Sequence, residues 1–325
     1  MAQTRERLRE FLFPPDSGRW LGILRIGAGL EVTLYAWSLR VDWNDLFGAK
    51  AHGLVNRALT EAILSSQTKF TPRLGWLTTA GQHLGLTEAT TLTLVWLGLV
   101  AAGLCLLIGI GCRFAAIAAW FLYVCSAKSG ILFTYGVDNF TTIGLFYLMI
   151  APLPDAWSLD WRVRKRRAAN PERLGFHRRV LQLHLCVIYF FGGLSKSLGT
   201  DWWNGNSIWR ALTRPPFDLI PPELLICFEL LLPVIGILVC VVETGYAVFI
   251  WSRQTRLAWL LGIVVMHLSI GLTMGLYLFA LIMIVLNLAA FGPGLERSFP
   301  NTVRSRRKTD DDASARMAAN FGESG

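Results

Sequence analysis

Lys196 lies at the end of an apolar stretch of membrane length, and its amine could either accept a proton or bind an anion. In residues 180–194 the strongly polar side chains are Gln182 and His184. Gln182, Tyr189 and Lys196 recur every seventh residue, so a helix with 3.6 residues per turn carries them on one face. That face should look toward protein rather than lipid. A lysine acts as a base only while uncharged, so this role requires a site that removes water from the amine.

Two glycines and a pair of tryptophans flank this lysine. Gly192 and Gly193 lie one turn before it and remove two side chains where another backbone, or a flat ligand, could come close. Trp202 and Trp203 follow in a polar loop, where amphipathic rings mark a boundary between membrane and water. We therefore predict a pocket in which the lysine is the reactive group and these four residues, with Tyr189, contact the ligand.

A family resemblance rests on the segment YFFGGLSKSLGTDWWNG. It is similar to the signature of the membrane domain shared by vitamin K-dependent gamma-carboxylases and their bacterial relatives, the horizontally transferred transmembrane (HTTM) proteins. The resemblance implies that Lys196 is the base that deprotonates a vitamin K-like hydroquinone. It also implies a quinone or hydroquinone as cofactor, and an enzyme that is carboxylase-like (carbon-carbon lyase type) or otherwise quinol-dependent. No metal is expected.

Two further segments carry this resemblance, which extends over roughly residues 15–291. In MHLSIGLTMGLYLFALIMI a His precedes a Gly-rich turn, which implies a catalytic role for His267; a hydrogen-bonded core histidine is the alternative. In FTYGVDNFTTIGLF this chain has Asp138 and Asn139 as candidate ligand contacts where the eukaryotic carboxylases carry an Asn-His pair. An asparagine does not titrate at physiological pH. Because of this change, and because the chain stops after the membrane domain, we expect no protein-glutamate carboxylation of the eukaryotic type.

The composition indicates a protein that crosses the membrane several times. Of the 325 residues, 53% are hydrophobic and 16% are charged, which favours lipid over water as the surroundings. We predict an all-α helical bundle with about eight transmembrane helices. The net charge of +9 lies in basic segments between apolar runs, so the expected partners are membrane lipids with anionic headgroups, and no nucleic acid. The six cysteines show no paired spacing and are expected to be packing thiols.

Three parts of the chain follow from this pattern. Residues 1–19 are a basic amphipathic cytoplasmic start without a removable signal peptide, 20–292 form the HTTM-like transmembrane domain, and 293–325 form a disordered cytoplasmic tail. Pro233 is expected to bend the sixth helix, and a glycine-rich break at 271–275 separates the last two. The apolar runs that predict the eight helices are 20–38, 91–111, 114–134, 140–153, the stretch that ends at Lys196, 223–246, and the two halves of 257–291.

Basic residues set the orientation of these helices. With both termini cytoplasmic, 21 of the 31 Lys and Arg residues fall in inside segments, 7 in outside segments and three within helices. We therefore predict a bacterial inner-membrane protein with residues 154–179 cytoplasmic and residues 41–90 and 199–221 outside. This topology gathers polar candidate residues near the outer leaflet. They are Lys128, Asp138, Asn139, Lys196, Glu229 and His267.

Two functions fit these residues. The first is an enzyme whose outer-leaflet pocket uses Lys196 as a base toward a lipid-soluble quinol, with a small hydrophobic substrate and a membrane or periplasmic redox partner. The second is a non-catalytic membrane partner, or a carrier of a small molecule or lipid, in which the lysine binds an anionic group. A base should face a cavity with His267 or a neutral amide nearby, whereas a structural lysine should touch a carboxylate or project into solvent.

Overall fold

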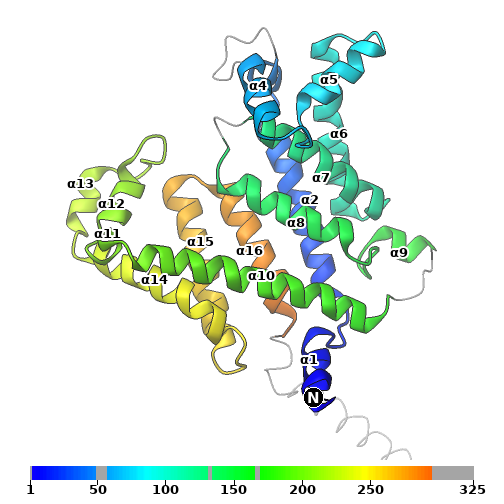
Figure 1. Cartoon of the computed structure of the whole chain (residues 1–325). Coiled ribbons are helices and arrows are strands. Elements are labelled where there is room, and N and C mark those ends of the chain that lie inside the picture. Colours follow the sequence, from blue (N-terminus) through cyan, green and yellow to red (C-terminus); the bar gives the residue numbers. More distant parts are fainter. Residues whose placement is uncertain (1, 49–56, 131–133, 165–168, 295–325) are drawn as a thin grey trace, which may run out of the picture. The chain divides into compact units, whose positions relative to one another are not determined.

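All regular structure in the described residues is helical (Figure 1). The computed structural model describes residues 2–48, 57–130, 134–164 and 169–294. The helices of 15 residues or more in these ranges are α2 (Arg19–Ser38), α6 (Glu88–Ile108), α7 (Cys112–Ser129), α8 (Gly136–Ile150), α10 (Pro171–Ser197), α14 (Leu231–Phe249), α15 (Arg256–Met274) and α16 (Tyr277–Phe291). The shorter elements are α1 (Ala2–Leu12), α3 (Trp43–Phe47), α4 (Arg57–Gln67), α5 (Leu74–His83), α9 (Leu159–Arg164), α11 (Thr200–Trp203), α12 (Asn206–Thr213), α13 (Pro222–Cys227) and the 3₁₀ helix η1 (Gly292–Gly294). The predicted all-α fold is confirmed, while the tail from residue 295 onward and residues 165–168 of the basic run lie outside the described residues.

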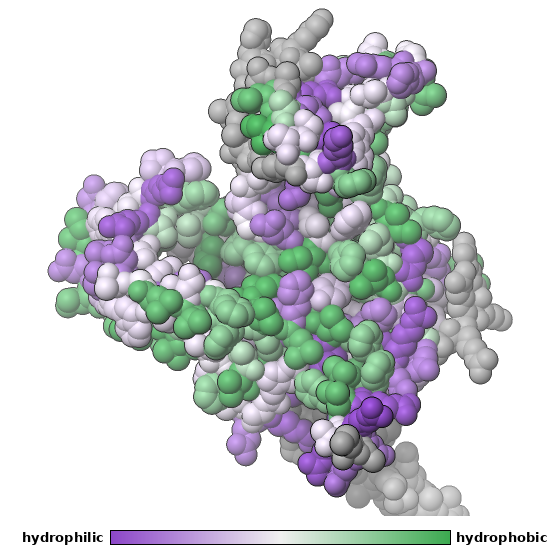
Figure 2. All heavy atoms as spheres, viewed as in Figure 1, coloured by the Kyte–Doolittle hydropathy of each residue, from purple (hydrophilic) through white to green (hydrophobic). Residues whose placement is uncertain are grey.

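Four of the described helices, α6, α10, α14 and α15, are long and apolar enough to cross a membrane. The helix α16 is apolar but shorter. Large hydrophobic side chains are exposed on these helices, such as Phe191 on α10 and Leu238 on α14, and Figure 2 shows hydrophobic residues gathered over both. Apolar surface of this extent is stable against lipid rather than water. The chain is thus a helical membrane protein, and the number of eight spans stays a prediction.

The helix α10, which carries Lys196, begins well before its apolar run. The side-chain oxygen of Asn170 accepts the N–H of Glu172 at 2.8 Å and so caps the helix. Pro171 fills the first helical position, where no N–H is needed. The second half of the predicted loop 154–179 is therefore helical. The high density of charged residues suggested a loop here, whereas the Asn-Pro-Glu sequence at 170–172 is a signal for the start of a helix.

The predicted sixth helix, 223–246, is two helices. The chain turns at residues 228–230 between α13 and α14, and Pro233 lies in the first turn of α14. A proline lacks the N–H that would bond to the residue four positions earlier, here Glu229, and its ring crowds that carbonyl. A continuous helix cannot form through this point. The bend predicted at Pro233 was therefore wrong, and a new helix starts there instead.

Two other helix ends bear on the candidate residues. The break predicted at 271–275 is confirmed, because α15 ends at Gly275, which has a φ of 72° that favours glycine. The helix α8 begins at Gly136, earlier than its apolar run. The carboxylate of Asp138 accepts the N–H of Tyr135 at 3.0 Å, which caps this helix start.

The helix α2 packs against α6, α8 and α16. Glycines allow its close approach to α6, because a Cβ on Gly29 would lie 2.6 Å from the backbone nitrogen of Leu107. A Cβ on Gly103 would likewise lie 3.0 Å from the backbone nitrogen of Thr33. Small residues of this kind bring helices together in lipid, where van der Waals packing drives association.

A buried ion pair fastens α2 to the segment that follows α8. Arg25 Nε donates to Asp155 Oδ2 at 2.5 Å, and a second guanidinium nitrogen donates to Oδ1 at 3.3 Å. The remaining nitrogen donates to the carbonyl oxygens of Leu106 and Leu107, the latter at 3.1 Å. Both charged side chains are 1% exposed. Every nitrogen of the guanidinium therefore has a partner, away from water and lipid.

Candidate ligand-binding site

Lys196 forms an ion pair with Glu243, an acid on α14. Its Nζ donates to Glu243 Oε2 at 2.5 Å. The two helices pack along each other, and Figure 1 shows them side by side. The lysine side chain is 27% exposed and the glutamate 9%. The pair is therefore open on its lysine side, where two of the three ammonium donors have no protein partner among the described residues.

The two glycines before Lys196 have different neighbours. A Cβ on Gly193 would lie 2.5 Å from the backbone nitrogen of Thr244, so only a glycine lets α10 approach α14 this closely. A Cβ on Gly192 would lie 3.3 Å from Glu243 Oε2 and 3.7 Å from Lys196 Nζ. Gly193 thus sets the helix packing, while Gly192 leaves space beside the ion pair itself.

The two tryptophans lie on the short helix α11 and not in a loop as predicted. The ring of Trp202 lies 5.5 Å from Lys196 Nζ, within range of a cation–π contact. Its carbonyl abuts Gly236 of α14, where a side chain would strike it. Trp203 is 48% exposed, and its indole N–H donates to the carbonyl of Ser197 at 2.8 Å. One tryptophan therefore borders the ion pair and the other faces outward.

A buried chain of polar side chains lies two helical turns below the pair. Asn287 of α16 donates from Nδ2 to the Tyr189 hydroxyl at 2.7 Å and accepts at Oδ1 from the Tyr246 hydroxyl at 2.7 Å. Tyr189 in turn lies 2.8 Å from His267 Nε2 of α15. The chain joins α10, α14, α15 and α16. The Tyr189 and Tyr246 rings are 4.4 Å apart between centroids.

Hydrogen-bond roles in this chain follow from one backbone contact. Asn287 Nδ2 also donates to the carbonyl of Met283 at 2.8 Å, and a carbonyl can only accept, so the amide orientation is fixed. The Tyr189 oxygen then accepts from Asn287, and its own proton can be donated to His267 Nε2 when the ring proton of His267 is on Nδ1. Nδ1 has no partner among the described residues.

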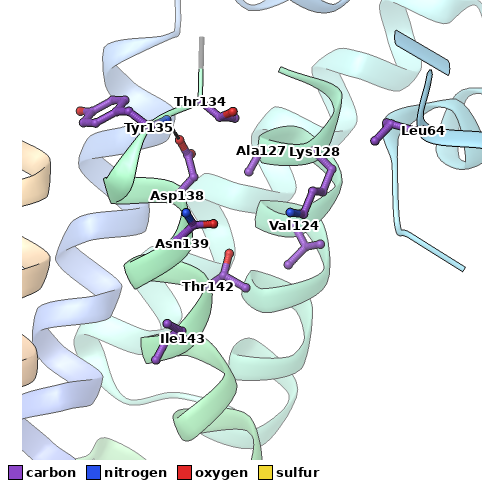
Figure 3. A pocket seen from close by; sticks show the side chains of 10 residues that line it. All are labelled: Leu64, Val124, Ala127, Lys128, Thr134, Tyr135, Asp138, Asn139, Thr142 and Ile143. Carbon is purple, nitrogen blue, oxygen red and sulfur yellow. Dashed lines mark hydrogen bonds between the residues drawn. The ribbon is translucent and has the colours of Figure 1, made fainter. Parts of the chain in front are cut away.

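A second polar region lies between α7, α8 and α4. A pocket of about 450 Å³ is lined there by Lys128, Asp138 and Asn139, among others. In Figure 3, Lys128 of α7 and Asn139 of α8 extend toward the space between their helices, whereas the Asp138 carboxylate turns back to the start of α8. None of the lining residues comes from α10, α14 or α15. The candidate residues that the predicted topology gathers near the outer leaflet therefore fall, apart from Glu229, into two groups, one around Lys196 and one around Lys128.

The acid near Lys196 in the structure is not the one that the sequence suggested. Glu229 is exposed in the turn before α14, and no contact joins it to Lys196 among the described residues. Glu243 was not predicted, although an acid in the apolar run LVCVVETG is costly in lipid unless it has a partner. That cost, combined with the close glycine packing of α10, was the available signal.

Comparisons with known proteins identify the family. The model of the HTTM domain matches residues 80–293, which includes both groups of polar residues and most of the long helices. Neither the curated proteins nor the solved structures gave a match. The match covers well over half of the chain, and it agrees with the apolar helices and with the motif around Lys196. This chain belongs to the HTTM domain family of membrane proteins.

Proposed function

We propose that the Lys196–Glu243 pair binds an acidic hydroxyl of a lipid-soluble, quinol-like molecule and removes its proton. The observation that carries this proposal is the open ion pair itself, 2.5 Å between Nζ and Oε2 with the lysine side chain 27% exposed. Membership of the HTTM family, whose membrane domain is similar to that of vitamin K-dependent gamma-carboxylases, supports a quinol-like ligand.

The pair offers both halves of a deprotonation. With Lys196 as an ammonium and Glu243 as a carboxylate, an oxygen of the glutamate accepts the hydroxyl proton while the ammonium stabilises the anion that remains. This assigns the base to Glu243 and the charge stabilisation to Lys196. The resemblance implies that Lys196 is the base, but by the criterion given above a lysine that touches a carboxylate does not fill that role. The base therefore moves to Glu243, and charge stabilisation is left to Lys196.

The surroundings of the pair suit a flat ring with an apolar tail. Gly192 carries no side chain beside the two charges, where a Cβ would lie 3.3 Å from Glu243 Oε2, and the Trp202 ring borders Lys196. Exposed apolar residues of α10, such as Phe191, continue from there toward lipid. A ring could lie between Gly192 and Trp202 while its tail follows these side chains.

Binding of a defined probe tests the proposal. Purified protein in lipid nanodiscs is titrated with a short-chain naphthoquinol, and binding is followed by quenching of tryptophan fluorescence. We expect the affinity to fall about tenfold or more in Lys196→Met and Glu243→Gln, because each variant loses a charge-assisted hydrogen bond. Lys69→Met is the matched control, since it removes an exposed lysine outside both polar groups. Equal binding by the wild type and both pair variants would contradict the proposal.

A second candidate function is binding of an anionic group by Lys196 without chemistry. The unused ammonium donors favour it. Glu243→Gln separates the two functions, because it removes a competing negative charge from an anion site but removes the proton acceptor from a deprotonation site. Tighter binding of an anionic lipid by this variant supports the second function. Loss of the ultraviolet change that accompanies quinol deprotonation supports the first.

A further inference from the structure

We propose that the pocket between α4, α7 and α8 binds the anionic head of a membrane amphiphile, with Lys128 as its counter-charge. This site is separate from the Lys196–Glu243 pair and does not rest on the function proposed there. The ligand is a lipid or fatty acid that carries a phosphate ester or carboxylate. The pocket has about 450 Å³, in the range of small-molecule sites.

The first argument is an unused charge. Lys128 is exposed in the last turn of α7 and forms no ion pair or hydrogen bond with any other described residue. Arg25 and Lys196, the other basic residues that the sequence places within helices, each have a carboxylate partner. Lys128 instead extends into the pocket, as Figure 3 shows. A cation at the edge of a membrane segment without a protein partner suits an anion from lipid.

The acid in the pocket wall does not supply that partner. Asp138 Oδ2 accepts the N–H of Tyr135 at 3.0 Å, and Oδ1 accepts the hydroxyl of Tyr123 at 3.2 Å. Asp138 is 8% exposed and attracts the Lys128 ammonium electrostatically, but the two side chains are not within ion-pair distance. Its charge is engaged in capping α8. The ammonium therefore remains available to a ligand.

Neutral donors and apolar walls complete the site. Asn139 and Thr142 line the pocket from successive turns of α8, and no hydrogen bond joins their side chains to other described residues. Asn139 lies at the end of the first turn of α8, where the helix dipole also favours a negative charge. Leu64, Val124 and Ile143 supply hydrocarbon on the remaining sides. This lining fits a charged head followed by the first carbons of an acyl chain, since polar and apolar parts of one ligand both find matching surface.

The test measures lipid binding to purified full-length protein in detergent by native mass spectrometry and thermal unfolding. Short-chain phosphatidylglycerol, short-chain phosphatidylcholine and inorganic phosphate are added at equal concentrations. We expect phosphatidylglycerol to bind the wild type and raise its unfolding midpoint, with little effect of the other two. Lys128→Gln should weaken this binding about tenfold or more, since a charge-assisted contact is lost. Lys69→Gln is the matched control, because Lys69 is exposed in the turn after α4, outside the pocket.

A second variant keeps the test decisive if Lys128→Gln folds poorly. Ile143→Trp fills the pocket without changing charge, and it should reduce phosphatidylglycerol binding in the folded fraction. Unchanged phosphatidylglycerol binding by folded Lys128→Gln or Ile143→Trp would overturn the proposal. Equal binding of phosphatidylcholine would overturn the role of the anionic head. An equal effect of inorganic phosphate would overturn the role of the acyl chain and indicate a site for a free anion.

Discussion

Two ion pairs in this chain are built from the same charges but are used differently. Arg25 makes four hydrogen bonds, two of them to Asp155, and both side chains are 1% exposed. Lys196 makes a single bond to Glu243, and its side chain is 27% exposed. The first pair is closed by the protein itself, whereas the second leaves donors and space on one side.

The difference shows how a membrane protein can separate stability from binding. A planar guanidinium can donate hydrogen bonds to a carboxylate and to backbone carbonyls at the same time, which suits a rigid connection between two segments. A lysine presents a compact charge with three donors, and here two remain for another molecule. A pair that is fully satisfied holds the fold, and a pair that is half satisfied can hold a ligand.

Breaking the closed pair should have the largest effect. Arg25→Met strands Asp155 as a buried charge and leaves the Leu106 and Leu107 carbonyls without their donor, at a cost of about 3–5 kcal/mol. We expect most of the folded, monodisperse protein to be lost in size-exclusion chromatography after detergent extraction. The double variant with Asp155→Leu should recover part of it, because the stranded charge is gone. Wild-type yield from the single variant would remove the distinction between the pairs.

Substitutions at the glycines beside the Lys196–Glu243 pair should have the next largest effect on stability. Gly193→Ala places a methyl group 2.5 Å from the Thr244 backbone nitrogen, so the helices must separate, which costs about 1–3 kcal/mol. Gly192→Ala meets only the ends of two flexible side chains, at 3.3 and 3.7 Å, and should leave stability nearly unchanged. Thermal unfolding of the two variants measures this contrast. Equal midpoints would mean that the close approach of α10 and α14 does not matter.

Opening the second pair should cost less stability than breaking the first. Lys196→Met keeps the length of the side chain but leaves the Glu243 carboxylate, which is 9% exposed, without its partner, and we expect a loss of about 1–3 kcal/mol. Binding of the naphthoquinol should nevertheless fall while the folded yield persists. The hypothesis that the Lys196–Glu243 pair serves ligand binding is contradicted if the Lys196→Met variant binds the naphthoquinol normally or does not fold.

Cysteine substitutions for side-specific labelling should have the smallest effect on stability. The labelling tests whether the two ion pairs lie near opposite surfaces of the membrane. Val163 and Asn206 are both exposed, the first in α9 after Asp155 and the second in α12 after Lys196. In a background without native cysteines, Val163→Cys should react with a membrane-impermeant maleimide only from the cytoplasmic side, and Asn206→Cys only from outside. Ser158 would be a poor probe because it is fully buried. Labelling of both from one side would contradict the predicted topology.

Local patterns predicted more of this molecule than distant pairings did. The face shared by Tyr189 and Lys196, the break at 271–275 and the helical fold all follow from spacing and composition. Partners from separate helices did not, because an acid in an apolar run, such as Glu243, signals the need for a partner without saying which residue on another helix supplies it. Helix starts were missed where charge outweighed a capping signal, as at Asn170. A proline read as a bend proved to be a helix start for a local steric reason.

The length of α10 has a consequence for how the bilayer acts on this protein. Its 27 residues measure about 40 Å, more than the roughly 30 Å of hydrocarbon in a typical membrane, so the charged start, residues 171–179, extends beyond the apolar part. At its start the helix is held by α1 and the residue after it, through a bond from Arg179 to the Phe11 carbonyl at 2.8 Å and stacked Phe13 and Phe176 rings 4.8 Å apart. At its other end it is held by α14. A change in bilayer thickness that tilts the apolar part of this helix, residues 180–194, must also move its charged start, so hydrophobic mismatch acts on both attachments at once.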